Sequence, residues 1–365
     1  MKKIIISGGG TGGHVYPAIA IADALKQIEP DIQILFVGAE GKMEMEKVPQ
    51  AGYRIIGLPI SGFQRQQMWK NVSFPFRLIK SLYQSWQIIN DFCPNVVVGV
   101  GGYASGAILQ VAVWRKIPTL IQEQNGYAGF TNKILAPQVQ KICVAYPDMG
   151  KYFPKEKIVF TGNPVRQKIA QNQISHQQAC AFWGFSPQKK TLLVLGGSLG
   201  AKTINQSILK GLFAFEQHSV QLLWQTGKNY YDNILQNIAP EHRNSTHIKI
   251  LPFITEMDFA YKAADVVISR AGALSISELC LAGKPCILVP SPNVAEDHQT
   301  KNAMALVQKE AAIMVKDSEA DSTLVNTALQ LLSDSATQQK LSSHISAFAK
   351  PEAARNIAQE ILKLC

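Results

Sequence analysis

A histidine set among glycines is the first residue of this chain that could do chemistry. Ser7-Gly8-Gly9-Gly10-Thr11-Gly12-Gly13-His14 follows directly after three isoleucines. Glycines let a ligand approach the backbone, and free amides at the start of a helix favour an anion. An imidazole at the mouth of a cleft has little core to fill and can accept a proton near pH 7. We predict that His14 is catalytic, and a purely structural histidine is the alternative.

The same loop also matches the G-x-G-x-x-G pattern, at Gly8, Gly10 and Gly13. A dinucleotide-binding site would need an acidic residue at the end of the second strand, about 20 residues further on. Glu40 comes later than that, so an NAD or FAD site stays a disfavoured alternative.

Two further polar segments follow apolar runs in the first half of the chain. Gly99-Val100-Gly101-Gly102-Tyr103-Ala104-Ser105-Gly106 repeats the glycine-rich pattern, and Gln122-Glu123-Gln124-Asn125 carries groups that can bind hydroxyls. We expect the glycine segment to form a wall for a phosphate or a sugar, through Gly101, Gly102, Tyr103 and Ser105. Ordinary turns and a polar surface loop are the alternatives.

The loop from Gly196 to Thr203 opens the second half and nearly reads as a P-loop. Ala201 stands where the second glycine belongs and adds a Cβ where phosphates need close backbone approach. This substitution disfavours an NTPase. A phosphate contact from Ser198 and the neighbouring amides remains our prediction.

The segment Ser269 to Leu279, SRAGALSISEL, is the strongest local block. It follows an apolar run and begins a helix, so the amides of Ala273 to Ser275 can bind a diphosphate. One turn further on, Glu278 can accept hydrogen bonds from both hydroxyls of a ribose. The alternative is that Glu278 only favours the dipole of the first turn.

Short β-branched runs alternate with helical stretches along the whole chain. The expected strands are residues 3–7, 32–37, 95–99, 118–122, 141–145, 157–160, 191–195, 221–224, 247–251, 265–269 and 286–290. This alternation predicts an α/β protein with two doubly wound parallel sheets, and ligands of such sheets bind at the carboxyl ends of the strands. We expect a hinge at Thr161 to Pro164 and a final amphipathic helix from Glu352 to Leu364.

The charge is uneven along the chain. The net charge is +10, and no acidic residue occurs between Lys47 and Asn90. That stretch is rich in basic residues and aromatics: Lys47, Arg54, Phe63, Arg65, Trp69, Lys70, Phe74, Phe76, Arg77, Lys80, Tyr83 and Trp86. Phe74, Leu78, Leu82 and Ile89 recur at helical spacing. We expect an anionic membrane surface to bind here, and a core helix is the alternative.

Other features limit the class of protein. The six cysteines are far apart and form no CxxC pair, so we expect reduced thiols and neither a metal nor a redox framework. The apolar stretch at residues 4–6 is too short for a signal peptide, and no run of 18 apolar residues predicts a membrane span.

In order along the chain, these blocks resemble the MurG glycosyltransferases: GGGTGGHVYPAIAIA, GVGGYASG, QEQNGYAGFTN, GNPVR, LGGSLGAKTIN, SRAGALSISEL and HQTKNA. The resemblance covers residues 4 to about 303. It implies a GT-B fold of two Rossmann-like domains with an interdomain cleft, and an inverting transfer of N-acetylglucosamine (GlcNAc). The resemblance further implies UDP-GlcNAc as the donor and undecaprenyl-diphospho-muramoyl-pentapeptide (lipid I) as the acceptor, which would become lipid II in peptidoglycan synthesis.

The resemblance also implies roles for individual residues. Those near the donor are Thr11, Gly12, Gly13, Asn125, Arg166, Ser198, Ile254 through its main chain, Ala273, Leu274, Ser275, Ile276, Ser277, Glu278 and Gln299, while Gly101, Gly102, Tyr103 and Ser105 are assigned to the acceptor. Two positions depart from the family pattern: Gln122 stands where histidine is common, and Ser275 where threonine is common. Both keep hydrogen-bonding ability.

The expected domains are residues 1–161 with a C-terminal helix at about 346–365, which bind the acceptor and the membrane, and residues 166–345, which bind the donor. We expect no cofactor, no metal and no nucleic acid, and a peripheral location at the cytoplasmic face of the bacterial inner membrane. A UDP-GlcNAc 2-epimerase and a non-catalytic nucleotide-sugar-binding membrane protein are the alternatives.

Overall fold

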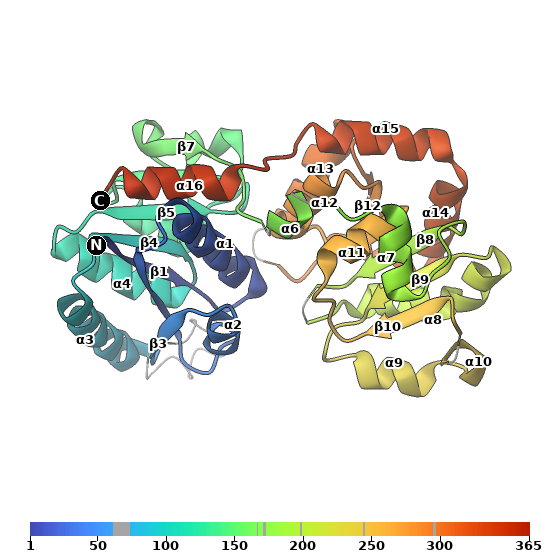
Figure 1. Cartoon of the computed structure of the whole chain (residues 1–365), viewed down its shortest axis with the longest axis horizontal. Coiled ribbons are helices and arrows are strands. Elements are labelled where there is room, and N and C mark those ends of the chain that lie inside the picture. Colours follow the sequence, from blue (N-terminus) through green and yellow to red (C-terminus); the bar gives the residue numbers. More distant parts are fainter. Residues whose placement is uncertain (61–73, 166, 171–172, 198, 244, 295–296) are drawn as a thin grey trace. The chain divides into compact units, whose positions relative to one another are not determined.

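The apolar runs form the strands of two separate parallel sheets (Figure 1). The computed structural model describes residues 1–60, 74–165, 167–170, 173–197, 199–243, 245–294 and 297–365. The chain divides into two units, Met1–Arg166 with Lys350–Cys365, and Gln167–Ala349. The expected boundaries at residues 161 and 346 lie a few residues before these. The predicted α/β class with two doubly wound sheets is confirmed.

The first unit has a seven-stranded sheet in the order β3-β2-β1-β4-β5-β6-β7, with every pair parallel. Its strands are β1 (Lys3–Gly8), β2 (Gln33–Ala39), β3 (Arg54–Leu58), β4 (Val96–Gly101), β5 (Thr119–Glu123), β6 (Lys141–Val144) and β7 (Ile158–Phe160). Its α-helices are α1 (Gly12–Ile28), α2 (Glu44–Gln50), α3 (Phe74–Phe92), α4 (Tyr103–Trp114), α5 (Phe130–Leu135) and α16 (Ala353–Leu362). Short 3₁₀ segments are Pro147–Lys151 and Lys155–Lys157.

Successive residues of each strand in this unit point to opposite faces. Ile5 packs with α3, α4 and α5, whereas Ile4 and Ile6 pack with α1 and α16. Such two-sided burial is why parallel strands read as continuous apolar runs. The predicted C-terminal amphipathic helix is confirmed as α16, which buries Ile357 and Ile361 beside α1.

The second unit has a six-stranded parallel sheet in the order β10-β9-β8-β11-β12-β13. Its strands are β8 (Thr191–Leu195), β9 (Gln221–Gln225), β10 (Ile248–Leu251), β11 (Val266–Ser269), β12 (Cys286–Leu288) and β13 (Ile313–Met314). Its helices are α6 (Gln167–Ala170), α7 (His176–Trp183), α8 (Lys202–Gln217), α9 (Tyr231–Asn237), α10 (Pro240–Arg243), α11 (Met257–Ala263), α12 (Ala273–Ala282), α13 (His298–Val307), α14 (Ala320–Ser333) and α15 (Ser335–Ser346), with a 3₁₀ segment at Asp317–Glu319.

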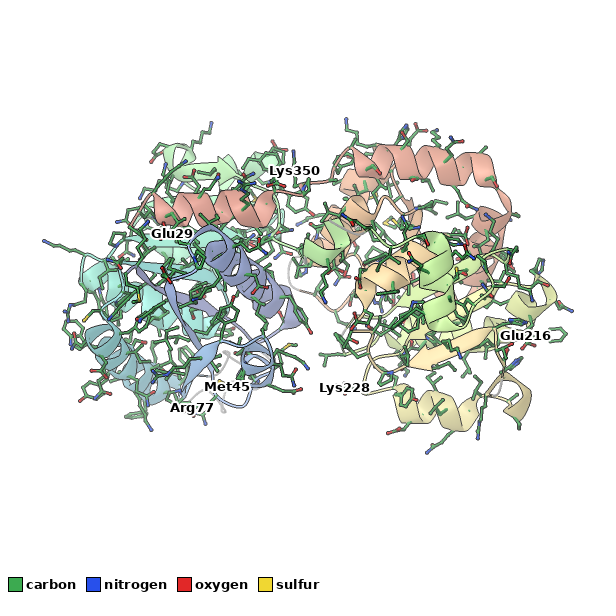
Figure 2. The ribbon with its side chains drawn as sticks, viewed as in Figure 1. Glu29, Met45, Arg77, Glu216, Lys228 and Lys350 are labelled. Carbon is green, nitrogen blue, oxygen red and sulfur yellow. The ribbon has the colours of Figure 1, made fainter. Side chains whose placement is uncertain are left out.

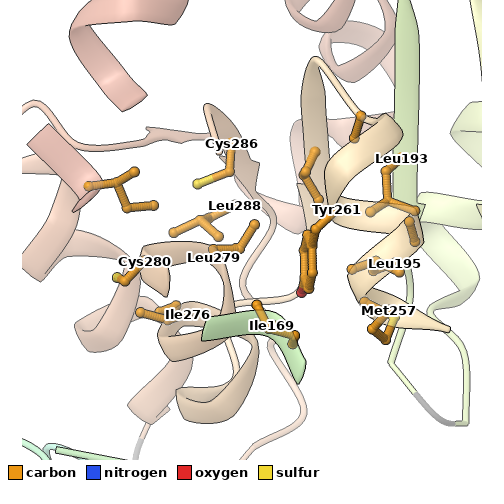
Figure 3. Close-up of a cluster of buried hydrophobic side chains, with 14 of the residues drawn as sticks. Ile169, Leu193, Leu195, Met257, Tyr261, Ile276, Leu279, Cys280, Cys286 and Leu288 are labelled. Carbon is orange, nitrogen blue, oxygen red and sulfur yellow. The ribbon is translucent and has the colours of Figure 1, made fainter. Parts of the chain in front are cut away.

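One face of this second sheet packs against α7, α11, α12 and α13, and the other against α8 and α14. Figure 3 shows part of the first core, where Tyr261 of α11 lies near Leu279 of α12 and Cys280 belongs to the same cluster. Burial raises the pKa of the Cys280 thiol to about 12, so this thiol stays protonated at neutral pH. All six cysteines of the chain are free.

Helix α3 corrects one expectation about the membrane surface. Ile89 is buried, and Leu78 and Leu82 pack against the core between α3 and the sheet, so this stripe faces inward. A different stripe faces outward, consisting of Phe76, Ile79, Tyr83 and Trp86. Within the described ranges, no helix combines the length and apolarity that crossing a bilayer requires.

Basic side chains accompany the outward stripe of α3. Arg77 and Lys80 are exposed on the same helix, and Figure 2 labels Arg77 there. The guanidinium of Arg115 lies 4.6 Å from the ring centroid of Trp86. The expected basic and aromatic residues Phe63, Arg65, Trp69 and Lys70 lie outside the described residues.

Candidate active site

His14 lies in the first turn of α1, directly after the glycine loop that ends β1. Thr11 is the N-cap residue with an extended backbone, and the amide of Val15 donates to its carbonyl over 3.2 Å. Gly12 and Gly13 begin the helix, where the first amides have no partner one turn back. The loop therefore offers main-chain donors beside the imidazole.

The imidazole of His14 is held in one orientation by its own loop. Nδ1 lies 2.9 Å from the carbonyl oxygen of Gly9 and 3.5 Å from Oγ1 of Thr11. A carbonyl oxygen can only accept a hydrogen bond, so the proton of the shorter contact is on Nδ1. In a neutral ring, Nε2 then carries the free lone pair. This is the tautomer that a general base needs.

The second glycine loop lies against the first. The amide of Gly9 donates to the carbonyl of Gly101 over 3.2 Å. A Cβ at Gly101 would lie 2.7 Å from Nε2 of His14, and one at Gly102 would lie 2.7 Å from the carbonyl oxygen of Gly9. Both glycines have positive φ, at 111° and 95°. Side chains at these positions would displace the imidazole or the loop, so the glycines are required there.

The remaining residues of this loop fall into two groups. Tyr103, at the first position of α4, is 46% exposed and open to a ligand. Ser105 is fully buried, and a Cβ at Gly99 would lie 2.6 Å from its Oγ, which has no hydrogen-bond partner among the described residues. The expected contact of the Ser105 hydroxyl with the acceptor is therefore corrected, because its position in the first turn points the side chain at the sheet.

Glu123, at the end of β5, shapes the loop that carries Asn125. This carboxylate is 2% exposed and accepts from the amides of Asn125 (3.1 Å) and Gly129 (2.9 Å). It also accepts from the side chains of Asn125 (3.3 Å) and Asn132 (2.8 Å). Four donors occupy its oxygens, so Glu123 orients Asn125 and is not free to act as a base. Our sequence prediction missed Asn132.

Gln122 belongs to a chain of buried amides. Its Nε2 donates to Oδ1 of Asn163 over 3.2 Å, and Asn163 donates back to the carbonyl of Gln124 over 3.0 Å. Gln124 in turn donates to Gln122 and to the carbonyl of Val100. These bonds join β4 and β5 to the expected hinge segment. The residue that departs from the family pattern therefore has a structural partner here.

In the second unit, Gln225 at the end of β9 connects two neighbouring loops. Its Nε2 donates to the carbonyl of Gly197 over 3.1 Å, and its Oε1 accepts from the amide of Ile254 over 2.9 Å. Ile254 is buried, and its amide already donates a hydrogen bond. Its carbonyl is therefore the main-chain group that could bind a nucleobase. Ser198 and Arg166 lie outside the described residues.

Helix α12 begins at the end of β11, in the arrangement predicted for anion binding. Gly272 is the N-cap residue with an extended backbone, and the first intrahelical bond runs from the Ile276 amide to Gly272 over 2.9 Å. The amides of Ala273, Leu274 and Ser275 are the ones that a helix start leaves without intrahelical partners. No acidic residue competes for them in the first turn.

The side chains in the first two turns of α12 differ in what they contact. Ile276 is buried in the core, and Ser277 Oγ donates to the carbonyl of Ala273 over 2.9 Å, so neither side chain is free for a ligand. The expected contribution of these two positions is therefore limited to the main chain. Ser275 and Glu278 are half-buried, and Oε2 of Glu278 accepts from the hydroxyl of Tyr261.

Two neighbouring groups support this region. Oε1 of Gln299, in the first turn of α13, accepts from the amide of Ser291 over 2.8 Å, which leaves its NH₂ group for a hydroxyl. Arg270 pairs with Asp317 and donates to the carbonyls of Val289 and Pro290. Among the residues that the structure describes, no group of three or more His, Cys, Asp or Glu could hold a metal ion.

Comparison with family models defines the class of protein. Residues 4–144 match the glycosyltransferase family 28 N-terminal domain, and residues 191–361 match the C-terminal domain of the same family. The chain therefore belongs to glycosyltransferase family 28.

Comparison with individual relatives shows which members of this family the chain resembles. The chain is 54% identical, over 365 residues, to the UDP-N-acetylglucosamine–N-acetylmuramyl-(pentapeptide) pyrophosphoryl-undecaprenol N-acetylglucosamine transferase of Bacteroides fragilis, and the match covers 99% of this chain and 95% of that one. The crystal structure of Acinetobacter baumannii MurG has a TM-score of 0.77 at 29% identity and full coverage of both chains. The resemblance to the MurG glycosyltransferases and the GT-B fold are confirmed.

The epimerase alternative is supported only at the level of the fold. A UDP-GlcNAc 2-epimerase from Neisseria meningitidis, solved with UDP-GlcNAc, has a TM-score of 0.64 at 16% identity over the whole of both chains. Likeness at this identity shows a shared architecture and carries no function.

Proposed function

We propose that this protein transfers GlcNAc from UDP-GlcNAc to the C4 hydroxyl of the muramoyl residue of lipid I, forming lipid II for peptidoglycan synthesis. The assignment of these substrates is supported by 54% identity, over nearly the full length of both chains, to a transferase named for this reaction. The geometry of His14 carries the chemistry, because its Nδ1 is engaged by the Gly9 carbonyl and its Nε2 is left to accept a proton.

In this proposal, Nε2 of His14 takes the proton of the acceptor hydroxyl as its oxygen attacks C1 of GlcNAc. The bond between C1 and the β-phosphate oxygen breaks, and the electron pair leaves with UDP. Attack opposite the leaving group inverts the anomeric centre. The helix start at Ala273 to Ser275 stabilises the charge that develops on the diphosphate.

The two units divide the work. The acceptor is bound by Gly101, Gly102 and Tyr103 in the first unit, beside His14. The donor is bound by the second unit, with the Ile254 carbonyl on the uracil, Glu278 on the ribose and Gln299 on the sugar hydroxyls. Ser198 and Arg166 contribute to the diphosphate site.

We further propose that the outward face of α3 binds the cytoplasmic surface of the inner membrane, where the acceptor is embedded. Its apolar side chains Phe76, Ile79 and Tyr83 are 74%, 65% and 63% exposed, with Arg77 and Lys80 between them. Apolar side chains flanked by cations suit an interface of lipid tails and anionic headgroups.

The test incubates the purified protein with labelled UDP-GlcNAc and a short-chain lipid I analogue. We expect label in the lipid product together with one equivalent of free UDP. Conversion of UDP-GlcNAc to its C2 epimer without acceptor would instead support an epimerase. Tight binding of UDP-GlcNAc with no product of either kind would support a non-catalytic sensor.

A further inference from the structure

A buried carboxylate lies behind the glycine loop and has no part in the mechanism above. Glu44 is the first residue of α2 and is completely buried. Its Oε1 accepts from the amide of Ala39, the last residue of β2, over 3.0 Å. Its Oε2 accepts from the amide of Gly10 over 2.9 Å.

The backbone around Glu44 leaves room for this carboxylate. A Cβ at Gly9 would overlap its oxygens, and one at Gly38 would lie 2.6 Å from its Cγ. The carboxylate of Glu44 thus fits only because two residues on different segments, Gly9 and Gly38, have no side chain. Burying a charged group is costly unless hydrogen bonds compensate. The two backbone hydrogen bonds that compensate here also connect Glu44 to the glycine loop.

The two ends of one peptide group connect Glu44 to His14. The amide that donates to Glu44 belongs to Gly10, and the carbonyl that accepts from His14 Nδ1 belongs to Gly9. These atoms form a single peptide unit, which is planar and trans, so its N–H and C=O point in opposite directions. Fixing the N–H on Glu44 therefore fixes the direction of the C=O that faces the imidazole.

The chain of bonds also polarises this peptide group. A carboxylate at the N–H draws that proton and increases the negative charge on the carbonyl oxygen, as in other cooperative hydrogen-bond chains. The stronger acceptor favours a proton on Nδ1 and leaves Nε2 unprotonated. The arrangement resembles a carboxylate–histidine pair with one peptide group inserted between the partners.

We propose that Glu44 is a positioning residue for catalysis, which orients and polarises the Gly9–Gly10 peptide so that His14 keeps its Nδ1–H tautomer. The inference rests on the proposed role of His14 as the base. Glu44 itself touches no substrate.

The first test measures the tautomer of His14 by ¹⁵N NMR in the free full-length protein. We expect a protonated Nδ1 and an unprotonated Nε2 in the wild type, and a clear shift toward the Nε2–H form in Glu44→Gln. The amide side chain keeps the shape but places an NH₂ group where one backbone donor needs an acceptor. Glu46→Gln, the same change at an exposed position of α2, is the control and should leave the signals unchanged. An unchanged tautomer in folded Glu44→Gln overturns the proposal.

The second test measures turnover. We expect Glu44→Gln to lower kcat by about 10–100-fold, the range for groups that orient a metal-ligating histidine. The KM for UDP-GlcNAc should not change. In a His14→Ala background the same substitution should cost nothing further, because both act through one imidazole. An equal loss in both backgrounds would mean that Glu44 acts elsewhere and would overturn the proposal.

A third variant tests the same role in case Glu44→Gln does not fold. Gly38→Ala places a Cβ against Cγ of Glu44 and changes no residue of the glycine loop itself. It should therefore reproduce both the shift in the His14 tautomer and the loss of kcat. Normal kcat and a normal tautomer in Gly38→Ala, with Glu44 displaced in its structure, would also refute the role. If the wild type transfers no sugar, the proposed function fails, whereas the NMR result still decides whether Glu44 sets the tautomer.

Discussion

The hydroxyl of Tyr261 donates to Oε2 of Glu278 over 3.2 Å, from the buried face of α11 to the second turn of α12. Tyr261 is 2% exposed, so its ring is fixed by the core around it (Figure 3). A fixed donor on one carboxylate oxygen orients the other. Glu278 is therefore presented as an oriented acceptor at the helix start that we assign to the diphosphate.

Glu278→Ala should weaken UDP binding by roughly 1.5–3 kcal/mol, because a charged acceptor for the ribose hydroxyls is lost. Calorimetry with UDP and with 2′-deoxy-UDP provides the sharper measurement. The wild type should prefer UDP, and the variant should bind both nucleotides alike. Tyr261→Phe, which keeps the carboxylate, should retain most of that preference. A variant that still discriminates between the two ligands would remove Glu278 from the ribose site.

His14→Ala should lower kcat by about 10²–10⁴, the range for general-base catalysis, with UDP affinity near that of the wild type. His14→Asn and His14→Gln keep a hydrogen bond but accept no proton at neutral pH, so neither should restore the rate. Steady-state transfer to a lipid I analogue is the measurement. Recovery of most of the rate by either amide would show that His14 only positions the acceptor.

Reversing Arg77 and Lys80 to glutamate should weaken binding to anionic vesicles by roughly 2 kcal/mol or more, since each basic residue near the surface contributes about 1 kcal/mol. Co-sedimentation with phosphatidylglycerol-containing vesicles measures this effect, and UDP binding should not change. Lys210→Glu with Lys309→Glu makes the same charge change in the second unit and is the control. Equal loss in both double variants would point to net charge and not to α3.

Lys284 should make stability rise with pH. Burial lowers the pKa of this ammonium below its ordinary value of 10.5, so the unfolded chain binds more protons between the folded and unfolded values. The free energy of unfolding should therefore increase as pH rises through that interval toward 10.5. Urea unfolding at a series of pH values from 7 to 10 should show a smaller rise in Lys284→Met than in the wild type. Lys309→Met, at an exposed position, should keep the wild-type slope.

The sequence predicted most of the sheets because parallel strands are buried on both faces. The run DVVIS became β11, and TLLVL became β8. Two strands were missed. β3 is an edge strand that pairs only with β2, and β13 is two residues long, so neither needs a continuous apolar run.

The glycine loops were predictable for a similar reason, since each follows a strand and adjacent parallel strands end at the same edge. β1 pairs with β4, which brings Gly9 and Gly101 into contact. The direction of a side chain in the first helical turn is not visible in the pattern, so the burial of the Ser105 side chain was not predicted. Glu44 was missed because GKMEMEK reads as a solvated helix start, and only the fold reveals that its carboxylate turns inward.

The position of α16 has a consequence for how the chain folds during synthesis. The apolar face of α1 is covered by residues 353–362, which the ribosome makes only after the whole of the second unit. The second unit can thus complete its core before the first receives its last helix, which shares a core with Ile21 and Leu25. Contacts between such distant segments form late. The unit that carries His14 therefore cannot complete its core until residues 353–362 have been made.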